Sequence, residues 1–147
     1  MPDDASQNYA NHAKFVTGFH VVLLGTLLLT LIGAGVNLYK SLGDHQRIYS
    51  ASLIFVLTFA TILASLFARM FALKAQDRAI RAEEQLRHFV LTGKLLDPRL
   101  TIRQIIGLRF APDKEFVELA RRAADEGMTE KAIKQAVKRW RPDTHRV

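Results

Sequence analysis

Two long stretches without charged residues place the strongest constraint on the fold of this chain. Residues 15–39 contain no Asp, Glu, Lys or Arg over 25 positions, and residues 48–68 contain none over 21. A helix that crosses the hydrocarbon core of a bilayer needs about 20 apolar residues. The alternative, two helices buried in a soluble core, is disfavoured because a chain of 147 residues has little else with which to surround them. The sequence therefore predicts two membrane-spanning helices.

The distribution of basic residues predicts how these helices cross the membrane. Of the 21 Lys and Arg residues, only Lys14, Lys40 and Arg47 precede Arg69, and 18 occur from Arg69 onward. Cytoplasmic segments next to a membrane carry the excess of Lys and Arg. We therefore expect the C-terminal part in the cytoplasm, and two spans place the N-terminus there as well. The connection at 40–47 becomes a short external turn, and the two spans form an antiparallel hairpin.

One uninterrupted helix is expected to extend from the second span into the cytoplasm. No Pro or Gly occurs between Arg47 and Gly93, so about 44 residues continue as a helix of roughly 65 Å. Gly93 is suited to the position that ends it. This interpretation divides the chain into residues 1–91, a transmembrane hairpin with a cytoplasmic stalk helix, and residues 92–147, a small basic helical tail.

The residues after Pro98 predict three short amphipathic helices. Thr101 is a candidate cap of the first, Pro112 opens the second, and Thr129 caps the third, which should extend to Trp140. A tail of this size forms a marginal domain by itself, so we expect it to pack on the long helix or on a partner. The expected fold class is an all-α membrane protein with a two-helix hairpin, a stalk and three short helices.

A regular series of small residues runs along the second long helix. Successive members are three and four residues apart, which is the a/d pattern of a left-handed coiled coil. Small residues let helix backbones approach closely in lipid. The series predicts a helix-packing seam, covered by the first span, by the N-terminal residues or by a second copy of the long helix; the alternative is that Ala is simply a strong helix former. The seam comprises Thr58, Thr61, Ser65, Ala68, Ala72, Ala75, Ala79 and Ala82, and Leu86 and Phe89 extend it.

No residue pattern predicts a catalytic, cofactor or metal site. The five histidines lack a metal-binding spacing such as H-E-x-x-H, and no P-loop, dinucleotide-binding glycine pattern or G-x-S-x-G is present. The chain has no Cys and therefore no thiolate chemistry. His20 lies within the first span, where an ionisable group is a hint of function; the alternative is that it reaches the headgroups. We expect no cofactor and no enzymatic activity.

Basic residues mark the last expected helix. On a helix they would share one face, opposite Ile133, Val137 and Trp140. Basic groups beside an anionic leaflet each add about 1 kcal/mol of attraction. Anionic lipid headgroups are the favoured ligand, and nucleic acid is disfavoured because acidic residues are interspersed and no reading motif is present. The alternative is an ordinary solvated face. The candidates for binding an anionic ligand are Lys131, Lys134, Lys138 and Arg141.

Several segments resemble a known family. They are "QDRAIRAEE", "LRFAPDKEF" and "WRPDTHRV", together with the opening "QNYANH", and they are similar to a bacterial family of short two-span membrane proteins whose function is not known. The resemblance covers most of the chain. It implies a two-span topology, a cytoplasmic helical tail and placement in the bacterial inner membrane, and it implies no reaction, ligand or catalytic residue.

Two hypotheses about function follow from these patterns. The leading one is a non-enzymatic interaction protein of the bacterial inner membrane, either an accessory subunit that binds a protein partner or a self-associating scaffold. The alternative is a membrane-tethered binder of anionic lipid or nucleic acid that uses the basic tail. An enzyme or transporter is disfavoured, because two spans line little by themselves and these spans contain no carboxylate.

Overall fold

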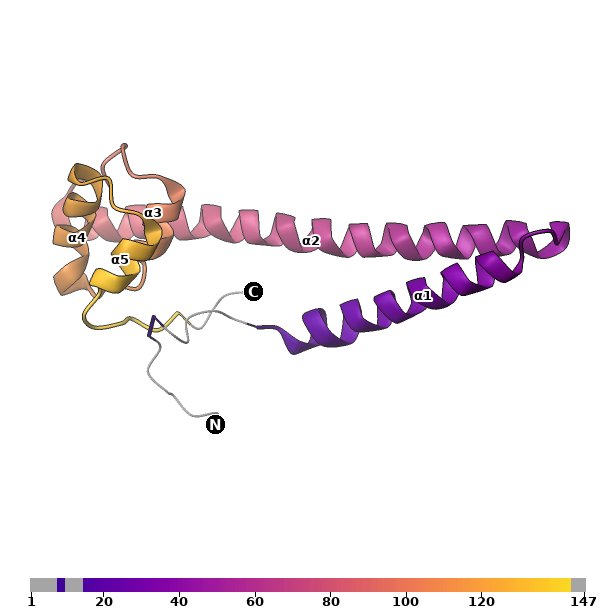
Figure 1. The fold of residues 1–147 in the computed structure, drawn as a ribbon. Helices are drawn as coiled ribbons and strands as arrows, with labels where there is room; N and C mark the ends of the chain where they lie inside the picture. Colours follow the sequence, from indigo (N-terminus) through magenta and orange to yellow (C-terminus); the bar gives the residue numbers. More distant parts are fainter. Residues whose placement is uncertain (1–7, 10–14, 144–147) are drawn as a thin grey trace. The chain divides into compact units, whose positions relative to one another are not determined.

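The computed structural model describes residues 8, 9 and 15–143, and these residues form helices without any β-strand (Figure 1). The described part therefore confirms an all-α fold. A π-helical segment, η1, spans Gly18–Leu23 and runs directly into α1. The α-helices are α1 (Leu24–Lys40), α2 (His45–Thr92), α3 (Ile102–Leu108), α4 (Asp113–Asp125) and α5 (Glu130–Ala136).

The chain forms two compact units, and the boundary between them lies within α2, between Ala72 and Leu73. The sequence analysis placed the boundary after residue 91 instead. The structure differs because the C-terminal part of α2 belongs to the core of the tail unit, where Ile80 and Glu84 are buried. This part of α2 is therefore an element of the tail domain, not only a stalk that leads to it.

Two helical stretches of the chain are long and apolar enough to cross a membrane. Their apolar parts lie in the first unit, residues 15–72. These stretches are Gly18–Lys40 and His45–Thr92. Within the most apolar 18 residues of each, only 6% and 11% of the residues are buried, whereas a core helix of a soluble protein is hydrophobic and buried all round. The length and composition of the two stretches agree with the spans expected from the sequence.

A capped turn separates α1 from α2. Gly43 has φ +91°, a left-handed conformation that glycine adopts without steric cost. The side chain of Asp44 then accepts hydrogen bonds from the backbone N–H groups of Gln46 at 3.0 Å and Arg47 at 3.3 Å. These bonds satisfy two of the free N–H groups at the start of α2. The turn expected at this connection is therefore present.

The expected end of α2 and the starts of the short helices are also confirmed. Gly93 has φ +73° directly after Thr92, and its N–H donates to the carbonyl oxygen of Phe89 at 2.7 Å. Thr101 caps α3 in a capping box. Thr129 caps α5, because its hydroxyl accepts a hydrogen bond from a backbone N–H in the first turn. Helix ends of this kind depend on neighbouring residues, so the sequence predicts them well.

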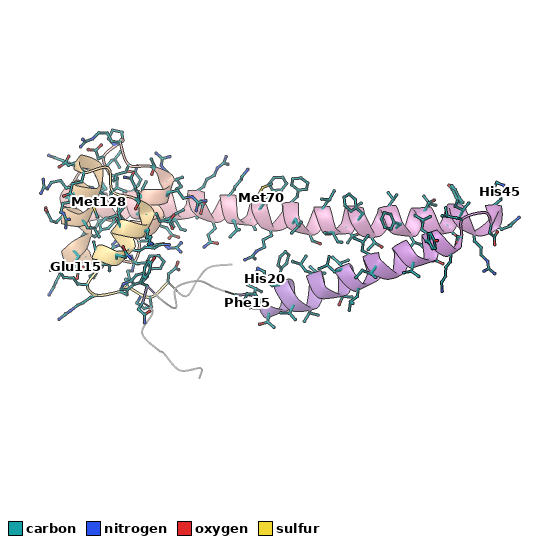
Figure 2. The ribbon with its side chains drawn as sticks, viewed as in Figure 1. Phe15, His20, His45, Met70, Glu115 and Met128 are labelled. Atoms are coloured by element: carbon teal, nitrogen blue, oxygen red, sulfur yellow. The ribbon has the colours of Figure 1, made fainter. Side chains whose placement is uncertain are left out.

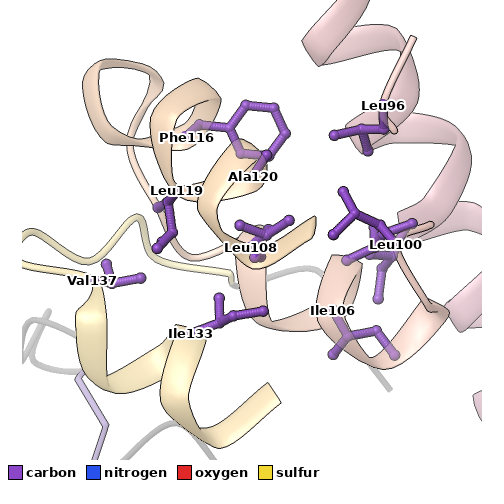
Figure 3. Packing of buried hydrophobic residues seen from close by; sticks show 13 residues of the cluster. Leu96, Leu100, Ile106, Leu108, Phe116, Leu119, Ala120, Ile133 and Val137 are labelled. Atoms are coloured by element: carbon purple, nitrogen blue, oxygen red, sulfur yellow. The ribbon is translucent and has the colours of Figure 1, made fainter. Parts of the chain in front are cut away.

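The tail unit is built on one apolar core shared by α3, α4, α5, the connecting loops and the C-terminal part of α2 (Figure 3). Its largest side chains that are almost completely shielded from solvent are those of Phe116, Ile105, Leu108 and Ile133. Full burial of one such side chain contributes about 1.5–3 kcal/mol. The buried residues of this core are Ile80, Leu96, Leu100, Ile105, Ile106, Leu108, Ala111, Phe116, Leu119, Ala120, Ala123, Ile133 and Val137.

The buried amide of Gln104 joins α3 to the end of α4. Its Nε2 donates to the carbonyl oxygens of Ala123 at 3.2 Å and Met128 at 2.9 Å, and its Oε1 accepts from the backbone N–H of Thr101 at 2.8 Å. A buried polar group is costly without hydrogen-bond partners, so this satisfied amide fixes how the two helices meet. It also supplies the second half of the capping box at Thr101.

The last helix ends earlier than expected. α5 stops at Ala136, and residues 137–143 form an irregular segment, the C-terminal strap. The helix predicted to reach Trp140 is wrong at this end, because the side chain of Trp140 packs against Phe110 with 4.6 Å between ring centroids. The N–H of Arg141 donates to the carbonyl oxygen of Phe110 at 2.8 Å. Contacts with the loop after α3 thus replace the last turn of the helix.

Gly107 marks a close approach of α3 to α5. A Cβ at this position would lie 3.2 Å from the carbonyl oxygen of Glu130 and 3.2 Å from Cγ2 of Ile133. Both separations are shorter than an ordinary van der Waals contact, and neither a backbone carbonyl nor a buried β-branched side chain moves aside easily. Gly107 is therefore required for the spacing of the two helices, although glycine disfavours the helix that contains it.

We expect Gly107→Ala to lower the free energy of unfolding of the tail unit by about 1–3 kcal/mol, the cost of overpacking a close contact. The measurement is urea unfolding of the full chain in mild detergent, followed by the emission of Trp140, the single tryptophan. Helix propensity alone predicts the opposite sign, a gain of about 1 kcal/mol. A stabilised variant would therefore show that α3 and α5 do not depend on this close approach.

Candidate functional site

An ion cluster joins the C-terminal part of α2 to the start of α4, and its central residue is Arg87. The guanidinium donates to Oε2 of Glu84 at 2.9 Å, to Oδ1 of Asp113 at 2.7 Å and to the carbonyl oxygen of Ala111 at 2.7 Å. Its Cζ lies 4.2 Å from the centroid of the Phe116 ring. The side chains of Arg87 and Glu84 are only 12% and 6% exposed, so both buried charges are paired. We call Glu84, Arg87 and Asp113 the Arg87 cluster.

The sequence analysis missed the Arg87 cluster. Glu84 and Arg87 are three residues apart on α2, a spacing that brings side chains together on a helix. The same spacing is common on solvated helix surfaces, and the burial of the pair arises only when the loop before α4 covers it. Because Arg87 binds groups from both elements, the cluster acts as a structural clamp between them.

A polar cavity of about 330 Å³ adjoins the Arg87 cluster, because Glu84 contributes to both. Nε of Arg109 lies 3.2 Å from Oδ2 of Asp143, and Nη1 of Arg141 lies 3.7 Å from Oε1 of Glu84. Oε1 of Gln76 is buried and accepts no hydrogen bond from the described residues. Basic and acidic side chains pair across this cavity and neutralise one another. In the described part of the chain, no group of three or more His, Cys, Asp or Glu side chains is arranged to hold a metal ion.

An exposed apolar face runs along the C-terminal part of α2. Its large members, Leu86, Phe89 and Val90, are 63%, 50% and 75% exposed. At 3.6 residues per turn, the face lies roughly 80–180° around α2 from Ile80, which packs in the tail core, and from the buried Glu84. The helices of the tail unit therefore leave this side of α2 uncovered. We define the open face as Ala75, Ala79, Ala82, Leu86, Phe89 and Val90, all of which are exposed.

The polar members of the predicted seam satisfy their hydroxyl groups within α2. Thr58 donates to the carbonyl oxygen of Ile54, Thr61 donates to that of Leu57, and Ser65 donates to that of Thr61, at 2.8–2.9 Å. Thr58 is buried, whereas Thr61 is exposed. None of the three hydroxyl groups therefore requires a hydrogen bond from a neighbouring helix, which suits a surface based on close backbone contact.

The alanine part of the predicted seam is largely exposed, although Ala79 borders the polar cavity beside Arg109 and Arg141. Ala72 is half-buried, and Ala68, Ala75, Ala79 and Ala82 are exposed. Of the N-terminal residues proposed as a cover, residues 10–14 lie outside the described part. Packing of the seam against another helix thus stays a prediction, and the N-terminal residues and a second copy of α2 both stay candidates for covering the exposed alanines.

The four basic residues proposed to bind an anionic ligand do not share a helical face. Lys131 and Lys134 lie on α5, whereas Lys138 and Arg141 lie in the C-terminal strap, where the helix has ended. Nζ of Lys134 also donates to Oε1 of Glu130 at 2.6 Å. The single basic face expected from helical spacing is therefore wrong. Binding of anionic lipid or nucleic acid by these residues stays a prediction.

His20 packs among aromatic rings at the start of the first apolar stretch. Its ring stacks on Phe15 with 4.7 Å between centroids (Figure 2). Its Nδ1 lies 2.9 Å from the carbonyl oxygen of Val16. The described contacts of His20 are local and point to no ligand. His12 and His145 lie outside the described residues.

Exposed ion pairs tie the loop before α3 to α4. The guanidinium of Arg99 binds the carboxylate of Asp97 at 2.7 Å and that of Asp125 at 2.9 Å. The hydrogen bond from Arg99 lowers the pKa of Asp97 to about 2. The ion pair between Asp97 and Arg99 within the loop is therefore retained under mild acidification.

A family model described as a family of unknown function, DUF6526, matches residues 1–147. The chain belongs to the DUF6526 family. Neither a curated protein nor a solved structure matches it. Membership in DUF6526 supplies no reaction, so function has to be argued from the surfaces of this chain.

Proposed function

We propose that this DUF6526 protein is a non-enzymatic interaction protein of the bacterial inner membrane, an accessory subunit or a self-associating scaffold. The apolar stretch Gly18–Lys40 and the apolar part of α2 cross the bilayer as an antiparallel hairpin, with both termini in the cytoplasm. The tail unit, from Leu73 onward, is then the cytoplasmic domain. Its role is to present a protein-binding surface next to the membrane.

The open face of α2 carries the proposal. Large exposed apolar surfaces are uncommon on soluble domains, and where they occur they mark sites of contact with proteins or membranes. Leu86, Phe89 and Val90 expose such a surface on the unit that also contains most of the charged residues. No paired nucleophile and base accompany it in the described residues, so contact with another protein is the function that this surface supports best.

Contacts within the first unit support the hairpin. A Cβ on Gly35 of α1 would lie 3.6 Å from the ring of Phe55 of α2, an ordinary van der Waals contact. The guanidinium of Arg69 lies 5.0 Å from the centroid of the Phe19 ring, within the range of a cation–π interaction. The excess of Lys and Arg from Arg69 onward supports cytoplasmic termini.

Labelling of single cysteines tests this topology, since the natural chain has no Cys. His45→Cys should react with an impermeant thiol reagent added outside spheroplasts, and Lys94→Cys should react only after the membrane is opened. Both side chains are exposed, and substitution at His45 avoids the left-handed backbone of Gly43. The reverse pattern, or equal labelling at both sites, would contradict the proposed topology.

A further inference from the structure

The open face of α2 has the geometry of one half of a parallel two-stranded coiled coil. Residues 79 and 86 occupy a positions and residues 75, 82 and 89 occupy d positions of a heptad repeat, and all five are exposed. In such a coiled coil the a and d side chains face the partner, while b, c and f lie on the outside. An exposed a/d row is therefore a surface that a second helix of the same pattern can cover.

The tail helices occupy the outer positions of the same repeat. Ile80 and Arg87 lie at b and Glu84 lies at f, and these residues contact the core or the loop before α4. The domain is thus attached to the side of α2 that faces away from the partner in a two-stranded coiled coil. The a and d residues remain exposed, although Ala79 and the neighbouring Glu83 also border the polar cavity that Arg109 and Arg141 line.

Charge complementarity identifies the partner. Arg78 lies at a g position and Glu83 at the e position of the next heptad, and side chains at these positions pair between the two helices of a parallel coiled coil. Both are exposed, and no ion pair joins either of them to another described residue. The twofold symmetry of a homodimer makes the contact twice, Arg78 to Glu83 and Glu83 to Arg78.

We propose that the open face binds a second copy of this chain, with the two α2 helices parallel and in register and with Arg78 of each copy paired with Glu83 of the other. The proposal rests on the proposed function, because two copies inserted in one membrane with the same topology necessarily have parallel α2 helices. Leu86 and Phe89 supply the apolar contact at one end of the interface, where Val90 flanks them at an e position. The alanine positions allow close backbones but bury less area than leucine would.

Cross-linking of the full chain in native membranes tests the face. Ala82→Cys, at a d position, should form a disulfide-linked homodimer on mild oxidation, because the Cα atoms of facing d residues lie within the range of about 4.4–6.8 Å that a disulfide needs. Arg81→Cys is the matched control at the same height on the helix but at an outer c position, and it should remain largely monomeric. Equal cross-linking of both variants, a monomeric Ala82→Cys chain, or its linkage to a different protein would overturn the proposal.

Charge exchange tests the partner and the register. Arg78→Glu and Glu83→Arg should each weaken dimerisation by roughly three- to tenfold, since each creates two like-charge contacts, and the double variant should restore it. The readout is energy transfer between copies labelled through Lys94→Cys in lipid vesicles, and the emission of Trp140 reports that each variant is folded. A double variant as weak as either single one would overturn the register. If the chain is monomeric but His45→Cys and Lys94→Cys react with the thiol reagent as expected, only the dimer is overturned. If the two cysteines react in the reverse pattern, the proposed topology, and with it the proposed function, is overturned.

Discussion

Arg87→Met should lower the free energy of unfolding of the tail unit by about 3–5 kcal/mol, the usual cost of leaving a buried charge without its partner. The substitution removes the three hydrogen bonds to Glu84, Asp113 and Ala111 and leaves the carboxylate of Glu84 buried with only the more distant Arg141, 3.7 Å away, as an ionic partner. Natural domains have a free energy of unfolding of only about 5–15 kcal/mol, so the loss is a large fraction of the total. Urea unfolding of the full chain in mild detergent, read from Trp140, measures it.

Two further variants distinguish a buried ion cluster from an ordinary salt bridge. Arg87→Met combined with Glu84→Leu should recover much of the loss, because an apolar pair can replace a buried ion pair at little cost. Arg103→Met removes a guanidinium that is 73% exposed and 3.8 Å from Glu130, and it should have a much smaller effect. If Arg87→Met destabilises the unit no more than Arg103→Met does, the Arg87 cluster is not a clamp.

Phe116→Ala should destabilise the tail unit by about 3–5 kcal/mol, the range for truncating a buried aromatic side chain. Phe116 has no exposed surface, and its ring contacts the guanidinium of Arg87 and lies 5.9 Å from the ring of His88. Leu95→Ala is the control, because Leu95 is 65% exposed and surface substitutions change stability by about 0.5 kcal/mol or less. The same unfolding assay compares them, and similar losses in the two variants would contradict the described core.

The positions of helix starts and ends were predictable because their causes are local. Gly93 ends α2 through its own positive φ, Thr101 caps α3 within one turn, and Pro112 immediately precedes α4. The uninterrupted helicity of α2 likewise follows from the absence of Pro and Gly. Each of these features depends on residues within a few positions in the sequence, which is the range over which propensity and capping act.

The burial of Arg87 and the early end of α5 were not predictable in the same way. Arg87 is buried because Ala111 and Asp113 lie on it, and the helix ends after Ala136 because Trp140 packs on Phe110. These contacts join residues more than 20 positions apart, and helical periodicity contains no information about them. The basic face that depended on an unbroken last helix was lost for this reason.

Periodicity gave the positions of the open face but not its exposure. The three-four spacing identified Ala75, Ala79 and Ala82 as one row, and it left undecided whether the row was covered by the same chain. The structure shows that the tail core uses the other side of α2, where Ile80 is buried. An apolar core residue and an apolar interface residue look alike in sequence, and only the packing of the tail distinguishes them.

The C-terminal strap also determines when the tail unit can fold during synthesis. The strap brings Trp140 against Phe110 and Arg141 within 3.7 Å of Glu84, so the unit closes on residues that are translated after all of its helices. The apolar helices, in contrast, have been translated completely by Ala72. Domains fold as units as the chain emerges from the ribosome. The membrane unit is therefore available for insertion while the tail is still incomplete, and the tail completes its fold only after the strap has emerged from the ribosome.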